Sequence, residues 1–325
     1  MLSTCFTGLA LSVAGLATAE VEIFTGELTS HAVIAGAALS LTAGSMIKGD
    51  LAAGGAANIG AGSGDFDEPI YQPNLFAGGA VTIGASSVVK DISAGAALTL
   101  GANAKANKVS VGAAYKLDAG ATVESKTTVG FSSEPGRIKT TSDMNAAIVQ
   151  IKSSKDALYR LPVTPGQGYH LPTTMIGGSF APGVYSGTVV TFAANSQIRY
   201  TNENNLENPV WIFNLHKGMN VGALSTFEAL VDGAGTVIWN IGGALTLGAG
   251  TDFSGVAFVG GAVSGVTSWV TCGNLYATAA VSIGSLNGAP GAASTHCPLS
   301  AKALGKVTVT VDNDALLDGV AINHN

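Results

Sequence analysis

The stretch AVTIGASSVVKDISAGA, residues 80–96, is followed at once by ALTLGANAKANKVSVGA, residues 97–113, and then by AYKLDAGATVESKTTVG, residues 114–130. Each copy starts 17 residues after the one before it. The same register returns in steps of 18 residues, from Ala38 to Ala56 and from Ala244 to Ala262 to Ala280. A short fixed period of strand-like sequence is typical of a solenoid.

Each copy alternates apolar and hydroxyl side chains, as in Val81, Thr82 and Ile83. Because successive side chains of a strand point to opposite faces, this pattern predicts Val81 and Ile83 inside the coil and Thr82 outside it. A glycine follows, at Gly84, Gly101, Gly248 and Gly284, where we expect the chain to turn a corner with a positive φ. A coil of this length with about three short strands predicts an all-β solenoid of triangular cross-section.

The composition excludes several other classes of protein. Charged residues make up 11% of the chain and hydrophobic residues 47%, which is the reverse of the composition of disordered segments. Beyond the N-terminus, no apolar run is long enough to cross a membrane without an interruption. The net charge of −6 comes without a basic patch, so we expect no nucleic-acid partner. We expect a monomer that has no membrane partner once the N-terminal segment is removed.

The N-terminal segment resembles a secretory signal. An apolar core runs from Phe6 to Leu16, and the small residues Ala17, Thr18 and Ala19 follow it, although the usual positive charge at the start is missing. We therefore predict a signal peptide over 1–19, a β-helix domain over 20–290 and a C-terminal tail over 291–325; the alternative for the first segment is a buried strand. Secretion would leave two cysteines in the mature chain, which permit one disulfide without showing that the two meet: Cys272 and Cys297.

One helix is predicted between the two groups of coils, over residues of about 142–160. Its apolar residues follow helical spacing on one face: Met144, Ala147, Ile148, Ile151 and Leu158. Ser142 is the candidate N-cap, Asp143 lies in the first turn, and Pro162 ends the helix. We expect this helix to lie along the solenoid wall with its apolar face buried there.

Four segments in the second half of the chain resemble the microbial ice-binding protein family: FAPGVYSGTVVTF (180–192), NPVWIFNLHKGMNVGA (208–223), GTVIWNIGGALTLGAGTDFSGVAFV (235–259) and AAVSIG (279–284). AVIAGAALSLTAGSMIKGDLAAG (32–54) is similar to the opening of that family. The resemblance implies a right-handed discontinuous β-helix with one long helix alongside, in which the first and last coils stack out of sequence order.

The resemblance also implies the function. It predicts a secreted protein without a cofactor or catalytic site, which adsorbs to ice through one flat face and inhibits ice growth and recrystallisation, as an antifreeze protein does in cold adaptation. Where the family often has Thr-Gly-Thr-Thr after Thr-Leu-Gly, this chain has Ala249, Gly250, Thr251 and Asp252. The alternatives are a structural or adhesive solenoid without ice activity and, less favoured, a polysaccharide-active enzyme, which would want paired carboxylates and exposed aromatics in a groove.

The repeat predicts the candidate ice-binding residues. One outward column contains Ser40, Asn58, Thr82, Thr99, Thr246, Ser264 and Ser282. A second column, four to five residues further on, contains Ser45, Ser63, Ser86, Ser87, Asn103, Thr251, Ser268 and Asn287. Lys116 takes the place of the hydroxyl in the third copy. The alternative is that these are β-compatible polar residues on a solvated face, or that they lie under the helix.

No other chemistry stands out. The histidines have no metal-ligand spacing, and IGAGSG (59–64) lacks the helix and the Gly-Lys-Ser/Thr sequence of a phosphate loop. Asp65, Asp67 and Glu68 could form a weak calcium site, but a solvated acidic loop is the favoured interpretation. We predict no metal site.

Overall fold

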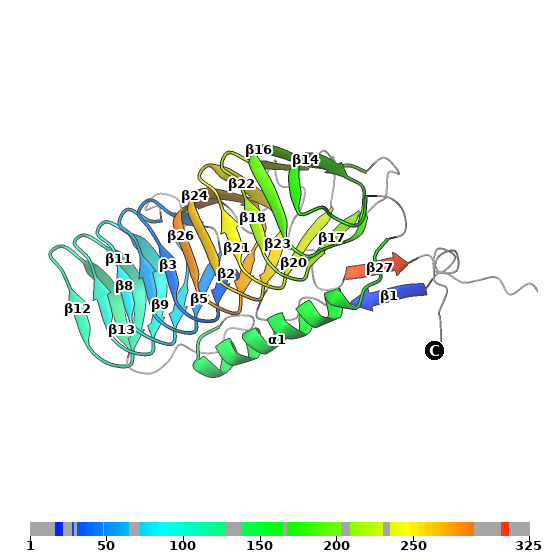
Figure 1. Cartoon of the computed structure of the whole chain (residues 1–325). Helices are drawn as coiled ribbons and strands as arrows, with labels where there is room; N and C mark the ends of the chain where they lie inside the picture. Colours follow the sequence, from blue (N-terminus) through cyan, green and yellow to red (C-terminus); the bar gives the residue numbers. More distant parts are fainter. Residues whose placement is uncertain are drawn as a thin grey trace, which may run out of the picture.

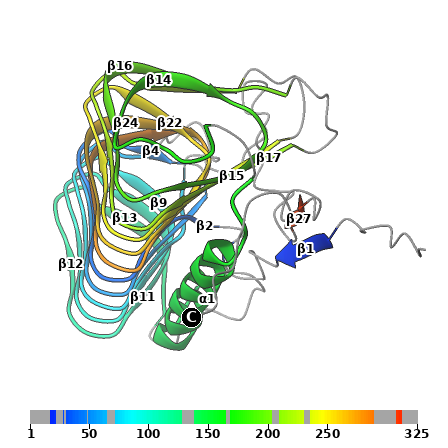
Figure 2. The same ribbon diagram turned by 45° about the vertical axis from the view of Figure 1, so that its right-hand side comes forward.

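A computed structural model describes residues 17–21, 28, 31–47, 49–64, 72–127, 138–164, 168–202, 209–229, 235–288 and 307–311. For residues 17–21, 127, 229, 267–272, 285–288 and 307–311 it describes the backbone alone. The chain winds into a long solenoid of stacked coils, with the helix α1 (Thr141–Tyr159) lying along one side (Figures 1 and 2). The predicted all-β solenoid with one helix alongside is confirmed.

Two parallel sheets form the walls of the solenoid. The larger sheet has fourteen strands: β3 (Leu39–Leu41), β4 (Met46–Ile47), β6 (Ala57–Ile59), β8 (Val81–Ile83), β10 (Leu98–Leu100), β12 (Tyr115–Leu117), β14 (Thr174–Phe180), β16 (Val190–Tyr200), β18 (Met219–Val221), β19 (Thr226–Ala229), β21 (Leu245–Leu247), β22 (Thr251–Ser254), β24 (Val263–Cys272) and β26 (Val281–Gly288). The smaller sheet has eleven: β2 (His31–Ala35), β5 (Asp50–Ala53), β7 (Leu75–Ala77), β9 (Val88–Ala94), β11 (Lys105–Val111), β13 (Thr122–Thr127), β15 (Gly183–Gly187), β17 (Val210–Leu215), β20 (Thr236–Ile241), β23 (Val256–Val259) and β25 (Leu275–Ala277).

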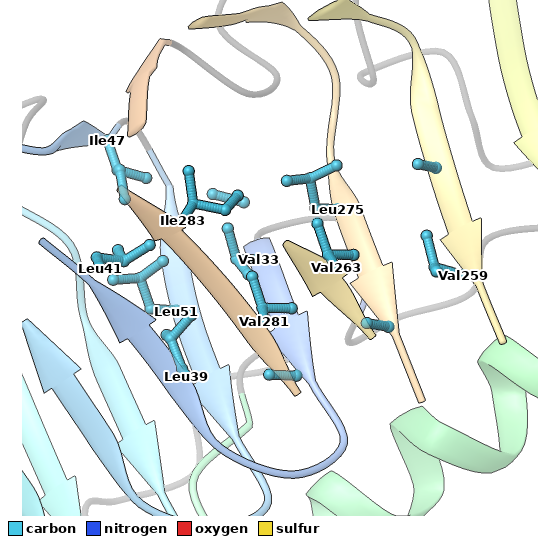
Figure 3. Packing of buried hydrophobic residues seen from close by; sticks show 14 of the residues in the cluster. Val33, Leu39, Leu41, Ile47, Leu51, Val259, Val263, Leu275, Val281 and Ile283 are labelled. Carbon is cyan, nitrogen blue, oxygen red and sulfur yellow. The ribbon is translucent and has the colours of Figure 1, made fainter. Parts of the chain in front are cut away.

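The coils do not stack in the order of the sequence. The first coil pairs with the last, because β3 lies parallel to β26 and β2 lies parallel to β25. From this junction the coils run in sequence order out to β12 and β13 at one end, and in reverse order back to β14 and β15 at the other. Figure 3 shows Val33, Leu39 and Leu41 of the first coil packing beside Leu275, Val281 and Ile283 of the last. The predicted discontinuity is confirmed.

The apolar residues form two cores. The larger one fills the solenoid and contains the inward members of the repeat together with the stacked rings of Phe213 and Trp239, whose centroids are 4.1 Å apart. The second core lies between α1 and the smaller sheet, where Ile34, Ile212 and Tyr276 contact the apolar face of the helix. This face is the predicted one: Met144, Ala147, Ile151 and Leu158 are buried and Ile148 is partly buried.

The predicted N-cap of the helix is wrong by two residues. Thr140 caps the helix: its Oγ1 accepts a hydrogen bond from the Asp143 amide at 3.1 Å, and Asp143 Oδ2 accepts one from the Thr140 amide at 2.9 Å. This reciprocal arrangement is a capping box, and it leaves Ser142 inside the first turn. The helix ends at Tyr159, before Pro162, as predicted.

The predicted reason for the corner glycines is also wrong. Gly84, Gly101 and Gly248 do not have a positive φ, and Gly284 lies within β26. A Cβ on Gly84 would lie 2.4 Å from the backbone nitrogen of Ala61 in the next coil, so close packing of coils excludes a side chain there. The positive φ falls two residues later, at Ser86 and Asn103.

The two ends of the described chain form a separate pair. β1 (Ala17–Val21) pairs antiparallel with β27 (Val307–Val311) beside α1 (Figure 1). Cleavage near Ala19 would fall inside β1. The predicted signal peptide and the other domain boundaries stay predictions.

Candidate functional site

The coils present three faces. The helix face is formed by the smaller sheet, except for the first halves of β9, β11 and β13. The helix α1 covers the outward residues of this face. The hydroxyl face consists of β3, β6, β8, β10, β12, β18, β21 and the first halves of β14, β16, β24 and β26. The charged face consists of β4, β19, β22, the second halves of β14, β16, β24 and β26, and the first halves of β9, β11 and β13.

One outward residue of each hydroxyl-face strand lies in register with its neighbour in the next coil. The resulting ladder runs, along the solenoid, through Lys116, Thr99, Thr82, Asn58, Ser40, Ser282, Ser264, Thr246, Asn220, Thr191 and Thr174. All of them are exposed or partly exposed. All seven members of the predicted first column therefore lie in one ladder. It crosses the junction between the chain's two halves without a break, at Ser40 and Ser282.

Three rungs of this ladder were not predicted from the sequence: Asn220, Thr191 and Thr174. Between Thr191 and Asn220, and again between Asn220 and Thr246, the coil is longer than 18 residues, so the fixed period does not find the next rung. The alternation Met219, Asn220 and Val221 is the signal that could have found Asn220, because both neighbours are apolar and point inward.

Small residues flank the ladder on both sides. Two residues before each rung the chain places alanine in eight of the coils: Ala38, Ala56, Ala80, Ala97, Ala114, Ala244, Ala262 and Ala280. Two residues after the rung, glycine recurs at Gly60, Gly84, Gly101, Gly222, Gly248 and Gly284. Because a Cβ on Gly60, Gly84 or Gly248 would lie 2.3 to 2.5 Å from the backbone of the neighbouring coil, this side of the ladder cannot carry side chains there. The hydroxyl face is therefore flat in most of its coils, whereas Val266, two residues after Ser264, and Ile176, two residues after Thr174, are 57% and 86% exposed there.

Most charged side chains of the described strands lie away from the hydroxyl face. Among the described strands of the hydroxyl face, the charged side chain is Lys116, which pairs with Asp118 at 3.0 Å in the outermost coil. The charged face carries Lys90, Lys105, Glu124, Arg199, Glu228 and Asp252. Arg199 Nε lies 3.5 Å from Glu228 Oε2, and burial together with the nearby Glu228 raises the pKa of Asp252.

Most of the predicted second column does not lie on the surface. Ser45, Ser63, Ser87 and Thr251 are buried, and their hydroxyls donate to carbonyl groups inside the corner, as Thr251 Oγ1 does to the Gly248 carbonyl at 2.7 Å. Their placement as outward ice-binding candidates is therefore wrong. Ser86 and Asn103 are exposed, at the corner next to the hydroxyl face. The side chains of Ser268 and Asn287 lie outside the described part of the chain.

Several other predictions concern residues that the structure does not describe. They are the pairing of Cys272 with Cys297, for which no side chain is described, and the acidic residues Asp65, Asp67 and Glu68. Within the described residues there is no group of three or more histidine, cysteine or acidic side chains that could hold a metal ion. In that same part of the chain, no helix is long and apolar enough to cross a membrane.

Comparison with known proteins agrees with this geometry. The model of the ice-binding-like family matches residues 33–287, which is most of the chain. The chain belongs to this ice-binding-like family. The matched residues include both groups of coils and the helix. They therefore include every rung of the ladder, since the first rung in the sequence is Ser40 and the last is Ser282.

Two solved structures of ice-binding proteins are similar to this chain. One, from the Antarctic ascomycete Antarctomyces psychrotrophicus, is 16% identical, and the likeness covers 80% of this chain and 93% of that one with a TM-score of 0.49. Another, a glycosylated ice-binding protein from an Arctic yeast, is 15% identical, with coverage of 84% and 96% and a TM-score of 0.50. At this identity the second likeness shows the fold alone. Among curated proteins, none matches this chain by sequence.

Proposed function

We propose that this member of the ice-binding-like family is a secreted monomer that adsorbs to ice through its hydroxyl face and so inhibits ice growth and recrystallisation. The proposal includes no catalytic step and no nucleic-acid or membrane partner. The observation that carries it is the ladder of ten consecutive serine, threonine and asparagine rungs, from Thr99 to Thr174, on a face that is uncharged over this length and flat in most of its coils.

The spacing of the ladder suits a crystalline partner. Neighbouring strands lie about 4.8 Å apart, so ten rungs extend over about 43 Å. Outward residues two apart along a strand lie roughly 6.7 Å from each other, so the alanine and hydroxyl columns form a two-dimensional grid. Such a grid can hold water molecules at regular positions and present them to an ice lattice.

Flatness and small side chains also favour adsorption. Each contact with ice is weak, so affinity requires many contacts at once, and a protruding side chain would separate its neighbours from the surface. Alanine loses no rotamer entropy on contact, and serine and threonine lose much less than lysine or arginine, for which the loss is about 2 kcal/mol. The helix face is covered by α1 and the charged face carries long charged side chains, so the hydroxyl face is the one that meets these requirements.

The second candidate function is a structural or adhesive solenoid without ice activity. Outward threonine and serine residues on a solvated β-sheet are compatible with it. The two functions differ in one respect, because only adsorption to ice requires that the ladder stay flat.

Replacement of Thr82 and Thr99 by lysine tests the proposal. Two adjacent lysines would protrude from the ladder, so we expect loss of recrystallisation inhibition at micromolar protein with an unchanged circular dichroism spectrum. Thr122→Lys is the matched control, since Thr122 is exposed on the charged face in register with Lys105. Full activity in the folded Thr82→Lys/Thr99→Lys variant, or no activity in the wild-type protein, would show that the proposal is wrong.

A further inference from the structure

The outermost coil of the solenoid, residues 114–127, departs from the other coils at a position that should be in the core. Leu75, Ile92 and Val109 form one column of buried residues in successive coils, and the next member of this column is Lys126. A second core column continues from Val81 and Leu98 to Tyr115. The repeat thus places a cation where its own pattern requires an aliphatic residue.

Lys126 lies over the end of the core. Its Nζ is 4.5 Å from the centre of the Tyr115 ring, which packs against the core. Leu117, in register with the buried Leu100, is 41% exposed. The same coil carries Lys116 and Asp118 as an ion pair on its hydroxyl-face side and Glu124 on its charged-face side. A charge thus lies on or beside both edge strands, β12 and β13.

At the junction between the first and the last coil, coil edges without such charges pair with each other. There the last coil offers the edges of β25 and β26, and the first coil pairs with them through β2 and β3 in the same parallel sense in which coils stack elsewhere. The two sides meet through aliphatic residues such as Leu39, Leu41, Val281 and Ile283 (Figure 3). Among the described strands, none pairs with the outer edges of β12 and β13, and these edges face the same way along the solenoid as those edges of β25 and β26. An edge of this kind can accept a second chain unless something prevents it.

The other end of the solenoid is protected differently. Thr164 and residues 168–171 lie along β15, where the Thr164 amide donates to the Val184 carbonyl at 3.0 Å and the Leu171 amide donates to the Ser186 carbonyl at 2.7 Å. The chain itself therefore covers part of that edge. At β12 and β13, charge is the protection that the described residues provide.

We propose that Lys126, assisted by Lys116, keeps a second copy of this protein from stacking on the β12 and β13 end of the solenoid. Stacking would bury the Lys126 ammonium between two apolar cores without a carboxylate partner, and burial of an unpaired charge is strongly unfavourable. The end coil is then a self-association surface at which the wild-type charges prevent association. This property is independent of ice binding. The partner is a second copy because the stacking edges and core columns belong to the repeat of this chain.

The test is sedimentation velocity over a range of protein concentrations. Lys126→Val restores the residue type of Val109, and Lys116→Thr restores that of Thr99. We expect the double variant to form dimers through its β12 and β13 end, with a dissociation constant lower by at least roughly tenfold. Lys126→Arg keeps a cation over Tyr115 and should stay monomeric. Lys108→Ser removes an exposed lysine from the wall one coil further in, and it should also stay monomeric.

The outcomes separate clearly. Association of the double variant but not of Lys126→Arg or Lys108→Ser supports the proposal. A folded double variant that stays monomeric at every concentration overturns it, as does a wild-type protein that associates equally. Should the double variant fail to fold, Lys126→Gln removes the charge with a smaller change, and a monomeric Lys126→Gln protein would overturn the proposal as well.

Discussion

Lys155 is a buried cation that joins the helix to the solenoid, and it makes the stability of the fold depend on pH. It is 7% exposed, and its Nζ donates hydrogen bonds to Asn240 Oδ1 at 3.0 Å, to the Phe258 carbonyl at 3.2 Å and to the Ile241 carbonyl. Burial lowers the pKa of Lys155 from 10.5 to about 8, while the nearby Asp156 opposes the shift. The three acceptors hold the ammonium in place, but desolvation determines the direction of the pKa shift.

The sign of the pH effect follows from the lowered pKa. Below pH 8 the folded and the unfolded chain both bind the proton, so Lys155 gives no pH dependence. Above it, the folded chain loses a proton that the unfolded chain keeps up to its pKa of 10.5, so the free energy of unfolding rises with pH. At 1.36 kcal/mol per pH unit, the rise between pH 8 and about 9.5 is about 2 kcal/mol. Burial raises the pKa of Tyr159 to about 12, and such tyrosines act in the opposite direction above pH 10, which sets the upper limit of the window.

The assay is guanidinium chloride unfolding at pH 7, 8 and 9.5 for the wild type, Lys155→Met and Lys152→Met. Lys152 is exposed on the same helix, so its replacement should leave the rise intact, whereas Lys155→Met should remove it. A wild-type stability that stays level or falls between pH 8 and 9.5 would refute the reasoning. So would an equal rise in Lys155→Met.

Three further substitutions follow from the packing of the coils. Ser87→Ala removes the hydroxyl that accepts a hydrogen bond from the Ser63 amide at 3.2 Å and donates one to the Gly60 carbonyl at 2.9 Å. The free energy of unfolding should fall by about 1–3 kcal/mol, and the folded variant should keep its ice activity. Loss of ice activity without loss of stability would contradict this. Gly84→Ala places a Cβ 2.4 Å from the backbone nitrogen of Ala61. The free energy of unfolding, measured by chemical denaturation, should fall by about 1–3 kcal/mol. An unchanged denaturation midpoint would show that the two coils can move apart to admit the methyl group. Tyr276→Phe removes the hydrogen bond that the Tyr276 hydroxyl donates across the junction to the Leu28 carbonyl at 2.6 Å. We expect about 1 kcal/mol of destabilisation and faster proteolysis of the N-terminal coils. Equal proteolysis rates for the wild type and the variant would argue against a role of this hydrogen bond in docking the first coil on the last.

The period of the sequence was enough to predict the solenoid, because the alternation around Val81, Thr82 and Ile83 repeats at a fixed step and each repeat buries the apolar face of that strand. The apolar spacing from Met144 to Leu158 likewise predicted the helix and its buried face. The stacking of the first coil on the last could not be predicted from the period, because the repeat gives every coil edge the same sequence pattern. It came from the family resemblance.

The errors arise where the backbone leaves the strand. Ser86 and Ser87 are adjacent, yet Ser86 is exposed at a positive φ and Ser87 is buried, because the corner changes which side of the chain points outward. A column counted from the strand cannot be extended past such a corner, and this is why Ser45, Ser63 and Thr251 were placed on the wrong side. The longer coils around Asn220 hid three rungs for a different reason: no fixed step leads from Thr246 to Asn220 or from Asn220 to Thr191, and Thr174 lies one 17-residue step before Thr191.

Direct adsorption to ice tests the central claim, that the hydroxyl face holds the protein on ice. Ice grown slowly from a dilute solution of labelled protein should take up the wild type and Thr122→Lys. It should leave in the liquid a folded variant with Thr82→Lys and Thr246→Lys, which carries one lysine in each half of the ladder. Equal uptake of the double lysine variant and the wild type into the ice would contradict the account, and so would exclusion of the wild type.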